Sequence, residues 1–192
     1  NGKANEGKVK RVGKGGREIW QQASYNPIFD ATGKPFKIVK YATDITGAQL
    51  KNADYAGQIN AIGKVMGVIT FDLKGNVTEV NDNFAAVTGY TREEILGKHH
   101  SLFIEPAYKN SPQYKQFWDN LGPGQADNGQ FRRLGKAGRE IWLEASYVPV
   151  ADETGKLFKV IKYAFDITAE KQRDAESQGQ IAAINKIMGV IE

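Results

Sequence analysis

The chain has no cysteine among its 192 residues. This absence excludes disulfide bonds, thiolate metal ligands and cysteine nucleophiles, and it is compatible with a reducing compartment. Histidine is scarce: His99 and His100 are neighbours without a third ligand at a suitable spacing, so the sequence predicts no metal site. Apolar runs such as Val65 to Phe71 are far shorter than the roughly 20 residues of a bilayer span, and no signal-type N-terminus is present. We therefore expect a soluble cytoplasmic fragment without membrane contact.

A concentration of charge of one sign is also missing. The net charge is +4 and the isoelectric point is near 9.1, but the 26 Lys and Arg residues are interspersed with 22 Asp and Glu residues. No dense basic run results, so we expect no nucleic-acid partner. No nucleophile–base pair or catalytic carboxylate pair is apparent. The glycine-rich segments 13–16 and 135–138 lie between expected strands, whereas a P-loop precedes a helix, and we expect no enzymatic activity.

The dominant feature of the sequence is an internal repeat. Residues 2–70 align with residues 124–192 without a gap, and just over half of the aligned residues are identical. Gly-Arg-Glu-Ile-Trp occurs at 16–20 and again at 138–142. The period has the size of a domain, so each repeat is a whole domain with its linker. The chain opens midway through one repeat and ends just after the start of a third, as expected for a segment of a longer protein.

The first half of the complete repeat has the pattern of a hairpin followed by short helices. Two β-rich runs, 67–72 and 77–80, flank the turn sequence Leu73-Lys74-Gly75-Asn76. Three short helices are expected next, each with its own start and stop signals. The first helix starts at the polar side chains of 81–83 and stops at Gly89, and the second starts at the Thr91–Glu94 capping box and stops at Gly97. The third starts at Ser111-Pro112 and stops at Gly122. Its apolar face carries Tyr114, Phe117, Trp118 and Leu121.

The second half alternates with a period of two. Strands are expected at about 128–135, 139–150 and 157–167, separated by glycine-containing turns. In the middle strand Ile141, Leu143, Ala145 and Tyr147 alternate with the more polar set Trp142, Glu144, Ser146 and Val148. The more apolar face, that of Ile141, should meet the helices. The predicted fold class is α+β: a five-stranded antiparallel sheet with short helices on one face and helical linkers between domains.

The order of these elements and several short motifs resemble the PAS family, and in particular the tandem PAS repeats of bacterial methyl-accepting chemotaxis proteins of the aerotaxis-receptor type. The resemblance covers residues 62–170. Its motifs are Gly75-Asn76-Val77, Asn81-Asp82-Asn83-Phe84, Thr88-Gly89-Tyr90, Glu94-Ile95-Leu96-Gly97, Gly138-Arg139-Glu140-Ile141-Trp142 and Asp166-Ile167-Thr168. The resemblance implies a sensory module whose sheet and helices enclose a pocket for flavin, heme or a small metabolite, or an interior filled by side chains.

The repeat and the resemblance together predict the domain organisation. Residues 1–46 are the C-terminal half, three strands, of a first PAS repeat; 47–61 are a linker helix; 62–168 are a complete PAS domain; and 169–192 are a linker helix with the first strand of a further repeat. An isolated three-stranded sheet leaves an apolar face in water. Because the helices at 82–121 have two similar sheets available, we expect self-association, as a homo-oligomer or a swapped dimer.

The candidate pocket residues are His99, His100, Phe103, Trp118, Phe131 and Tyr147. A histidine can donate a hydrogen bond to a flavin or ligate heme iron, and the aromatic side chains suit the wall of a mainly apolar slot. The alternatives are ordinary core packing for the aromatic residues and a solvated or helix-capping role for the histidines. No catalytic or metal-binding residue is predicted.

By resemblance, His100 stands where the blue-light flavin PAS proteins have their reactive cysteine, and Ala164 stands where they have a flavin-contacting glutamine. That photochemistry is therefore excluded. Flavin-binding aerotaxis receptors similarly carry a histidine near His100 and an aromatic pair near Phe117-Trp118, which leaves FAD open. Heme sensors often place their ligand on the helix at 111–121, which has no histidine here, so heme is the weaker prediction. A pocket without a cofactor remains the third option.

The linkers 47–66 and 169–188 carry a heptad-like spacing of apolar residues, among them Tyr55, Ile59 and Ile62. A capping box of Thr46 with Gln49 is expected to start the first linker helix, whereas Thr168 has no such partner at 171. The function predicted is a sensor that detects a ligand, redox state or oxygen and relays it through the linkers to a downstream chemoreceptor signalling domain. The alternatives are a structural dimerisation array without a ligand, and the PAS input of a histidine kinase or cyclic-dinucleotide enzyme.

Overall fold

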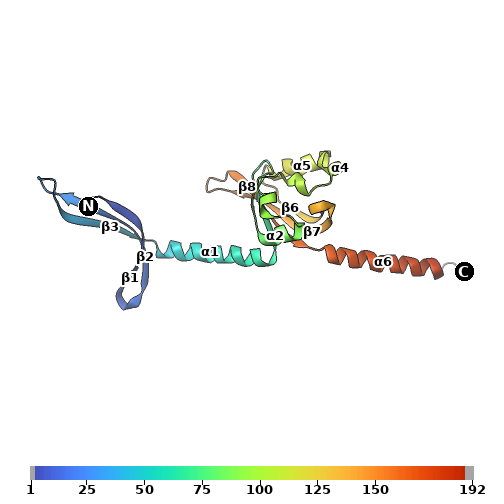
Figure 1. Cartoon of the computed structure of the whole chain (residues 1–192), viewed down its shortest axis with the longest axis horizontal. Helices are drawn as coiled ribbons and strands as arrows, with labels where there is room; N and C mark the ends of the chain where they lie inside the picture. The colour runs from blue at the N-terminus through green and yellow to red at the C-terminus, as the bar shows by residue number, and fades with distance from the viewer. Residues whose placement is uncertain (1–2, 189–192) are drawn as a thin grey trace. The chain divides into compact units, whose positions relative to one another are not determined.

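A computed structural model describes residues 3–188 and divides the chain into two compact units, Asn1–Ala61 and Ile62–Glu192 (Figure 1). The second unit contains a five-stranded sheet with the order β5-β4-β8-β7-β6, in which every neighbouring pair is antiparallel. Its strands are β4 (Gly67–Phe71), β5 (Val77–Val80), β6 (Asp127–Leu134), β7 (Glu140–Ala151) and β8 (Leu157–Asp166). The predicted α+β class and five-stranded antiparallel sheet are confirmed.

Four short α-helices and a 3-10 helix connect β5 to β6. They are α2 (Asp82–Thr88), α3 (Arg92–Ile95), η2 (His100–Phe103), α4 (Pro106–Lys109) and α5 (Pro112–Leu121). Phe84 of α2, Ile95 of α3 and Leu121 of α5 are buried in one cluster with the inner side chains of the sheet. The helices therefore cover one face of the sheet and close a single core.

The helix boundaries follow the capping signals of the sequence. The Asn81 side chain accepts a hydrogen bond from the Phe84 amide at the start of α2, and Gly89 ends this helix with a left-handed backbone, φ 76°. Thr91 and Glu94 form the reciprocal capping box at α3. Each cap satisfies backbone amides that a helix terminus leaves without a partner, which is worth about 1 kcal/mol. Local chemistry thus sets where each short helix begins.

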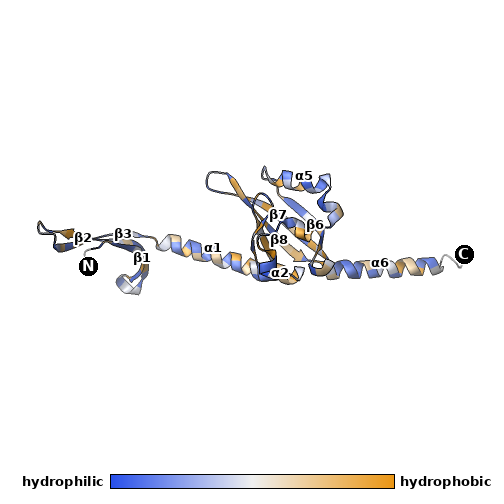
Figure 2. Ribbon diagram, turned by 45° about the horizontal axis from the view of Figure 1, so that its top comes forward, coloured by the Kyte–Doolittle hydropathy of each residue, from blue (hydrophilic) through white to orange (hydrophobic). Residues whose placement is uncertain are grey.

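The middle strand β7 separates an inner and an outer face of the sheet. Ile141, Leu143, Ala145 and Tyr147 are buried, while Trp142 on the other face is half-buried. Much of the hydrophobic colour in Figure 2 lies in β7 and β8. Complete burial of a large apolar side chain stabilises the fold by about 1.5–3 kcal/mol, so this alternation fixes the register of the strand.

The first unit contains β1 (Asn5–Val12), β2 (Glu18–Phe29) and β3 (Pro35–Asp44) in the order β1-β2-β3, followed by α1 (Thr46–Val65). Its pairing repeats that of the complete domain, including a register shift after Ile28 that matches the shift after Val150. The inner face lacks the cover found in the second unit: Ile38 is 68% exposed, whereas Val160 at the aligned position is 1% exposed. The first sheet therefore leaves apolar side chains of its inner face exposed, Ile38 among them.

Helix α6 (Thr168–Met188) follows β8 directly. The strand expected after Met188 lies outside the described residues. Within the described part of the chain, no helix combines the length and the hydropathy that a bilayer crossing requires.

The two linker helices begin in the same way, which corrects the expected capping box of Thr46 with Gln49. The Thr46 hydroxyl accepts a hydrogen bond from the backbone N–H of Trp20 at 2.9 Å, and the Thr168 hydroxyl accepts one from the N–H of Trp142 at 2.9 Å. Each threonine therefore joins a strand to a helix. The capping box does not form because Thr46 is already the first residue of α1, and the Gln49 amide donates to the Ile45 carbonyl oxygen instead.

A glycine at the end of β6 provides a test of this packing. A methyl group on Gly135 would lie 2.6 Å from the backbone oxygen of Thr88, whereas one on Gly13, the aligned residue, would meet the mobile end of the Ile19 side chain at 2.8 Å. We expect Gly135→Ala to lower the free energy of unfolding of the complete domain by about 1–3 kcal/mol. Urea titration followed through the NMR amide signals of 62–168 measures this. An unchanged midpoint, or an equal loss for the first sheet in the control Gly13→Ala, would contradict the packing described.

Candidate functional site

The interior of the complete domain centres on His100, which is 1% exposed. Its 3-10 helix holds the ring between α5 and the sheet: Nδ1 lies 3.0 Å from the hydroxyl of Tyr114, and Nε2 lies 3.1 Å from the hydroxyl of Tyr147. A neutral imidazole has one donor and one acceptor nitrogen, and a tyrosine hydroxyl can take either role. Both ring nitrogens are therefore engaged inside the protein.

Aromatic side chains surround this histidine. The ring of Phe71 lies edge-on at a centroid distance of 5.3 Å, that of Trp118 lies edge-on at 5.5 Å, and that of Phe117 is stacked at 5.7 Å. These separations are in the range of favourable aromatic contacts. The side chains of β4 and α5 thus occupy the space around His100.

Two buried cations lie beside the same network. Arg133 of β6 is 6% exposed and donates a hydrogen bond from Nη2 to the Tyr147 hydroxyl at 3.2 Å. Lys162 of β8 is 1% exposed, and its ammonium nitrogen lies 4.8 Å from the centroid of the Tyr147 ring and 5.3 Å from that of Phe84. Neither cation has a carboxylate ion-pair partner among the described residues.

This positive environment shifts the titration of its neighbours. Burial, followed by the charges of Arg133 and Lys162, holds the pKa of His100 well below its usual value. Burial alone would raise the pKa of the Tyr147 phenol, but the two cations lower it. Burial lowers the pKa of the Lys162 ammonium, and burial raises the pKa of the Tyr114 phenol. The network therefore favours a neutral histidine and stabilises negative charge at Tyr147.

The structure brings together four of the six candidate pocket residues. Trp118 and Tyr147 contact His100, and Phe131 lies 5.3 Å from Tyr147, measured between ring centroids. The other two lie beside this group: the His99 ring is 6.2 Å from the Trp118 ring, measured between centroids, and Phe103 belongs to the same buried core cluster as Tyr147. Phe103 packs edge-on against Phe84 and Tyr90, and His99 caps the 3-10 helix by accepting a hydrogen bond from the Ser101 amide.

The sequence interpretation did not include Arg133 and Lys162. The signal was available: Arg133 lies two residues after Phe131, and Lys162 lies between Val160 and Ala164, so the period of two places both on the inner face. The repeat contains the same two residue types at Arg11 and Lys40. Charged residues in a strand are ordinarily assigned to solvent, which concealed these positions.

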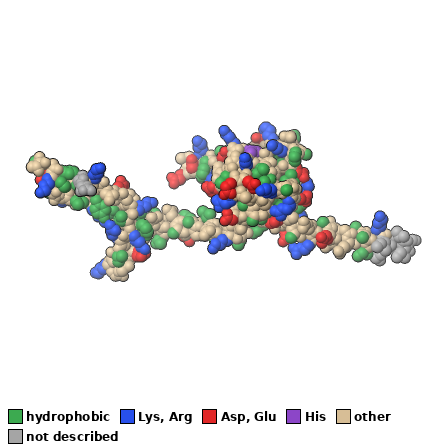
Figure 3. All heavy atoms as spheres, in the orientation of Figure 1, with side chains coloured by type: hydrophobic (Ala, Val, Ile, Leu, Met, Phe, Trp, Pro, Cys, Tyr) green, Lys and Arg blue, Asp and Glu red, His purple; other side chains and the backbone are tan. Residues whose placement is uncertain are grey.

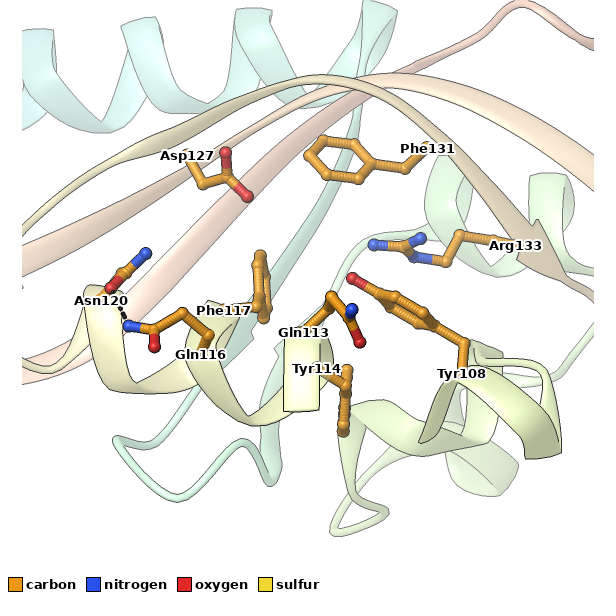
Figure 4. Close-up of a pocket in the computed structure, with 9 residues that line it drawn as sticks. All are labelled: Tyr108, Gln113, Tyr114, Gln116, Phe117, Asn120, Asp127, Phe131 and Arg133. Carbon is orange, nitrogen blue, oxygen red and sulfur yellow. Dashed lines mark hydrogen bonds between the residues drawn. The ribbon is translucent and has the colours of Figure 1, made fainter. Parts of the chain in front are cut away.

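A surface pocket of about 280 Å³ lies between α5 and β6 and reaches Arg133 (Figure 4). A second pocket of about 270 Å³ also reaches Arg133 and adjoins Arg132 and Glu105. Both are slightly smaller than typical ligand pockets, which occupy roughly 300–1,000 Å³. Figure 3 shows Lys, Arg, Asp and Glu side chains interspersed over the surface of this unit.

The described residues do not fit heme or flavin. Both His100 nitrogens have tyrosine partners, so neither is free to ligate iron. Phe117 and Tyr114 are stacked beside the His100 ring at 5.7 and 5.8 Å, which leaves no planar slot for a macrocycle or an isoalloxazine ring there. In the described part of the chain, no group of three or more His, Asp or Glu side chains is placed to hold a metal ion.

The comparison with protein families agrees with this architecture. Residues 77–164 match the family model described as PAS fold. This match covers most of the five-stranded sheet and all the helices over it. The chain contains a PAS domain. The PAS domain of a protein from Colwellia psychrerythraea has the same fold: it superposes with a TM-score of 0.52 at 22% identity, over 60% of this chain and 98% of that domain.

Two relatives are similar to this chain in sequence. The biofilm dispersion protein BdlA of Pseudomonas aeruginosa is 43% identical over 167 residues, which cover 87% of this chain and 40% of BdlA. The aerotaxis receptor of Escherichia coli is 32% identical over 88 residues, which cover 46% of this chain and 17% of the receptor. The chain is thus related to a biofilm dispersion protein and to an aerotaxis receptor, and it spans less than half the length of either relative.

The buried histidine predicts a pH dependence of stability. Because the folded PAS domain lowers the pKa of His100 below the ordinary 6.5, the unfolded chain binds the proton more readily. The stabilisation of the folded state that depends on a neutral His100 is complete above pH 6.5. It is lost as pH falls below 6.5, at up to about 1.4 kcal/mol per pH unit.

We expect His100→Gln to reduce this loss, since the amide can replace the ring in both hydrogen bonds without gaining charge. Urea unfolding at pH 7 and pH 5 compares the two proteins, with His99→Gln as the matched control. An identical change of stability with pH in wild type and His100→Gln would show that His100 does not titrate as described.

Proposed function

We propose that the PAS domain is a non-enzymatic sensory module of a chemotaxis-type receptor. In this proposal a change within the interior network alters the position of α6, which relays it to a downstream signalling domain. The relationship to the aerotaxis receptor of Escherichia coli supports the receptor class.

The observation that carries the proposal is the junction between sheet and helix. Thr168 accepts a hydrogen bond from the Trp142 amide of β7, and its own amide donates to the Asp166 carboxylate at 2.9 Å. The first turn of α6 also packs on the outer face of the sheet, where Lys171 lies 5.4 Å from the Trp142 ring. Strands β7 and β8 therefore hold the start of the output helix on one face and the buried polar network on the other.

The strand register connects the two faces. Tyr147 of β7 pairs directly with Lys162 of β8, and four residues away along each strand Leu143 pairs with Asp166 at the junction. A displacement of Tyr147 relative to Lys162 changes the pairing that positions Asp166. Packed strands transmit such displacements because interiors are close-packed and resist compression.

The entry helix has a corresponding attachment. The Asn81 amide donates hydrogen bonds to the carbonyl oxygens of Gly63 and Met66 at 2.9 and 2.8 Å, while its carbonyl oxygen accepts from the amides of Val68 and Phe84. One side chain thus joins the end of α1, the first strand and α2. In the proposal it is the point at which a preceding domain acts on this one.

The proposed input is a small molecule or a change of charge in the network, rather than flavin or heme. The support is the filled space around His100 and the engagement of both its ring nitrogens. FAD would require Phe117 to leave this position. The output domain, whether of a chemoreceptor or of a kinase, would receive the same mechanical change from α6.

A second candidate function, dimerisation, is favoured by two sets of exposed apolar side chains. Tyr55, Ile59 and Ile62 form the heptad-like series on α1, and they are exposed. The inner face of the first sheet also exposes Ile38, which stands at the position of Val160 in the complete domain. We propose that a second copy of the helical segment 82–121 covers that sheet, which gives a swapped dimer.

The relay predicts that Thr168→Ala loosens α6 without unfolding the PAS domain. Removal of the hydroxyl leaves the Trp142 amide without its partner and costs about 1 kcal/mol. We therefore expect amide hydrogen exchange in the first turns of α6 to accelerate about fivefold. Thr168→Ser keeps the hydroxyl and is the control. Equal exchange in the alanine and serine variants would argue against the junction as the relay.

The swapped arrangement predicts a dimer in sedimentation velocity experiments. Ile38→Lys places a charge on the inner face of the first sheet and should shift the equilibrium toward monomer by at least tenfold. Tyr41→Lys, on the outer face, is the matched control because the exposed fractions of the two side chains are nearly equal, 68% and 67%. A wild-type monomer with freely exchanging amides in β1 to β3 would refute the swap.

A further inference from the structure

The positive charges of Arg133 and Lys162 have no anionic counterpart inside the PAS domain. The buried polar or charged residues, within the part of the chain that the structure describes, are Thr70, Thr88, His100, Arg133 and Lys162, and none of them is a carboxylate. Burial of a charge without a partner is costly, so buried cations are ordinarily paired. An anion that enters this region would remove that cost.

Arg133 has donor capacity that the protein leaves unused. One N–H of Nη1 donates to the Arg132 carbonyl oxygen at 2.8 Å and one N–H of Nη2 donates to Tyr147. Its Nε–H is buried and has no hydrogen-bond partner. A guanidinium has five N–H groups, and Nε together with one Nη can hold both oxygens of a carboxylate. The missing partner is therefore of the kind that a carboxylate supplies.

The neighbouring carboxylates do not fill this role. Glu105 lines the adjacent pocket, but it is paired with Arg132 at 2.5 Å. Asp127 lines the pocket between α5 and β6 and lies well apart from the Arg133 guanidinium in Figure 4. Arg133 thus faces this pocket with its charge uncompensated.

The walls of the pocket suit an apolar body. Tyr108, Phe117 and Phe131 surround the space in Figure 4, and the Arg133 guanidinium lies 4.8 Å over the Phe131 ring. The volume of about 280 Å³ admits a molecule with one ring or a short chain. Asp127 at the far side disfavours a second negative charge on the ligand.

We propose that this pocket binds a small organic monocarboxylate, with its carboxylate on Arg133 and its apolar body between Tyr108, Phe117 and Phe131. The inference deepens the proposed function, on which it rests for its role as the sensory input. The hydrogen bond from Arg133 to Tyr147 connects the bound anion to the buried network. A carboxylate bound to Arg133 compensates its positive charge and so weakens the effect of that charge on Tyr147, which also lies beside Lys162.

The first sheet provides an internal control. Arg11 aligns with Arg133 and donates a hydrogen bond to the hydroxyl of Tyr25, the counterpart of Tyr147, at 3.3 Å. Arg11 is exposed, and no aromatic wall from helices surrounds it within its unit. The same residue is therefore present once with an enclosing pocket and once without.

The test is calorimetric titration of the chain with benzoate, neutral benzamide and inorganic phosphate at fixed ionic strength. We expect benzoate to bind at least tenfold more tightly than the other two. Benzamide replaces the charge-assisted pair with a neutral contact, and phosphate is an anion without an apolar body. Arg133→Gln should lower the affinity for benzoate at least tenfold, whereas Arg11→Gln should leave it unchanged.

An NMR measurement on the unmutated chain keeps the test independent of folding in the variants. The signal of the Arg133 Nε–H should shift on addition of benzoate and remain in place with benzamide. Absence of benzoate binding, equal binding of benzamide or phosphate, or an unmoved Nε–H signal would overturn the proposal. The relay is judged separately, from hydrogen exchange in α6 of the Thr168→Ala and Thr168→Ser variants, so the pocket and the relay can fail independently.

Discussion

Arg133 and Lys162 are buried beside Tyr147, and none of the buried residues that the structure describes is a carboxylate. The rest of the domain depends on this constraint. Burial, together with the two positive charges beside it, holds the pKa of His100 well below its usual value, so the ring is neutral. A neutral imidazole can bridge two tyrosine hydroxyls, and this bridge ties α5 to β7. Burial and the two neighbouring cations thus favour the neutral ring that links the helical layer to the sheet.

The internal repeat shows that this arrangement belongs to the sheet itself. Arg11, Tyr25 and Lys40 stand at the aligned positions of the first unit, with the same arginine–tyrosine hydrogen bond and with the lysine 5.6 Å from the ring. There the three side chains face solvent, where water screens the charges at little cost. The helical cover of the complete domain buries the same cluster, and two buried cations favour an anion. Whether the cluster favours an anion therefore depends, in both sheets, on whether helices cover it.

The sequence predicted the local structure well because local signals determine it. Asn81, the Thr91–Glu94 box and Ser111 cap the helices that they were expected to cap, and the apolar alternation from Ile141 to Tyr147 placed the inner face of β7. The start of α1 was predicted wrongly, since the Thr46 hydroxyl bonds to a strand 26 residues away in the chain rather than to its own helix. Long-range competition of this kind has no signature within a short window.

The site was only partly predictable for a related reason. Aromatic residues identified the region of Trp118, Phe131 and Tyr147, but the charges of Arg133 and Lys162 were hidden by the rule that charged residues are exposed. The signals that pointed to them were the strand period of two and the repeat, which has an arginine and a lysine at the aligned inner-face positions. The contacts of Phe103 with Phe84 and Tyr90 could not be predicted, because they depend on the path of the chain through the 3-10 helix.

The protonation state of His100 tests the central claim most directly. In a ¹⁵N NMR titration of the imidazole from pH 7.5 to pH 5, the account predicts a neutral ring well below pH 6.5, with each nitrogen shifted by its tyrosine partner. An imidazolium already formed at pH 6.5 would contradict it, because both the burial of the ring and the charges of Arg133 and Lys162 disfavour a positive charge there.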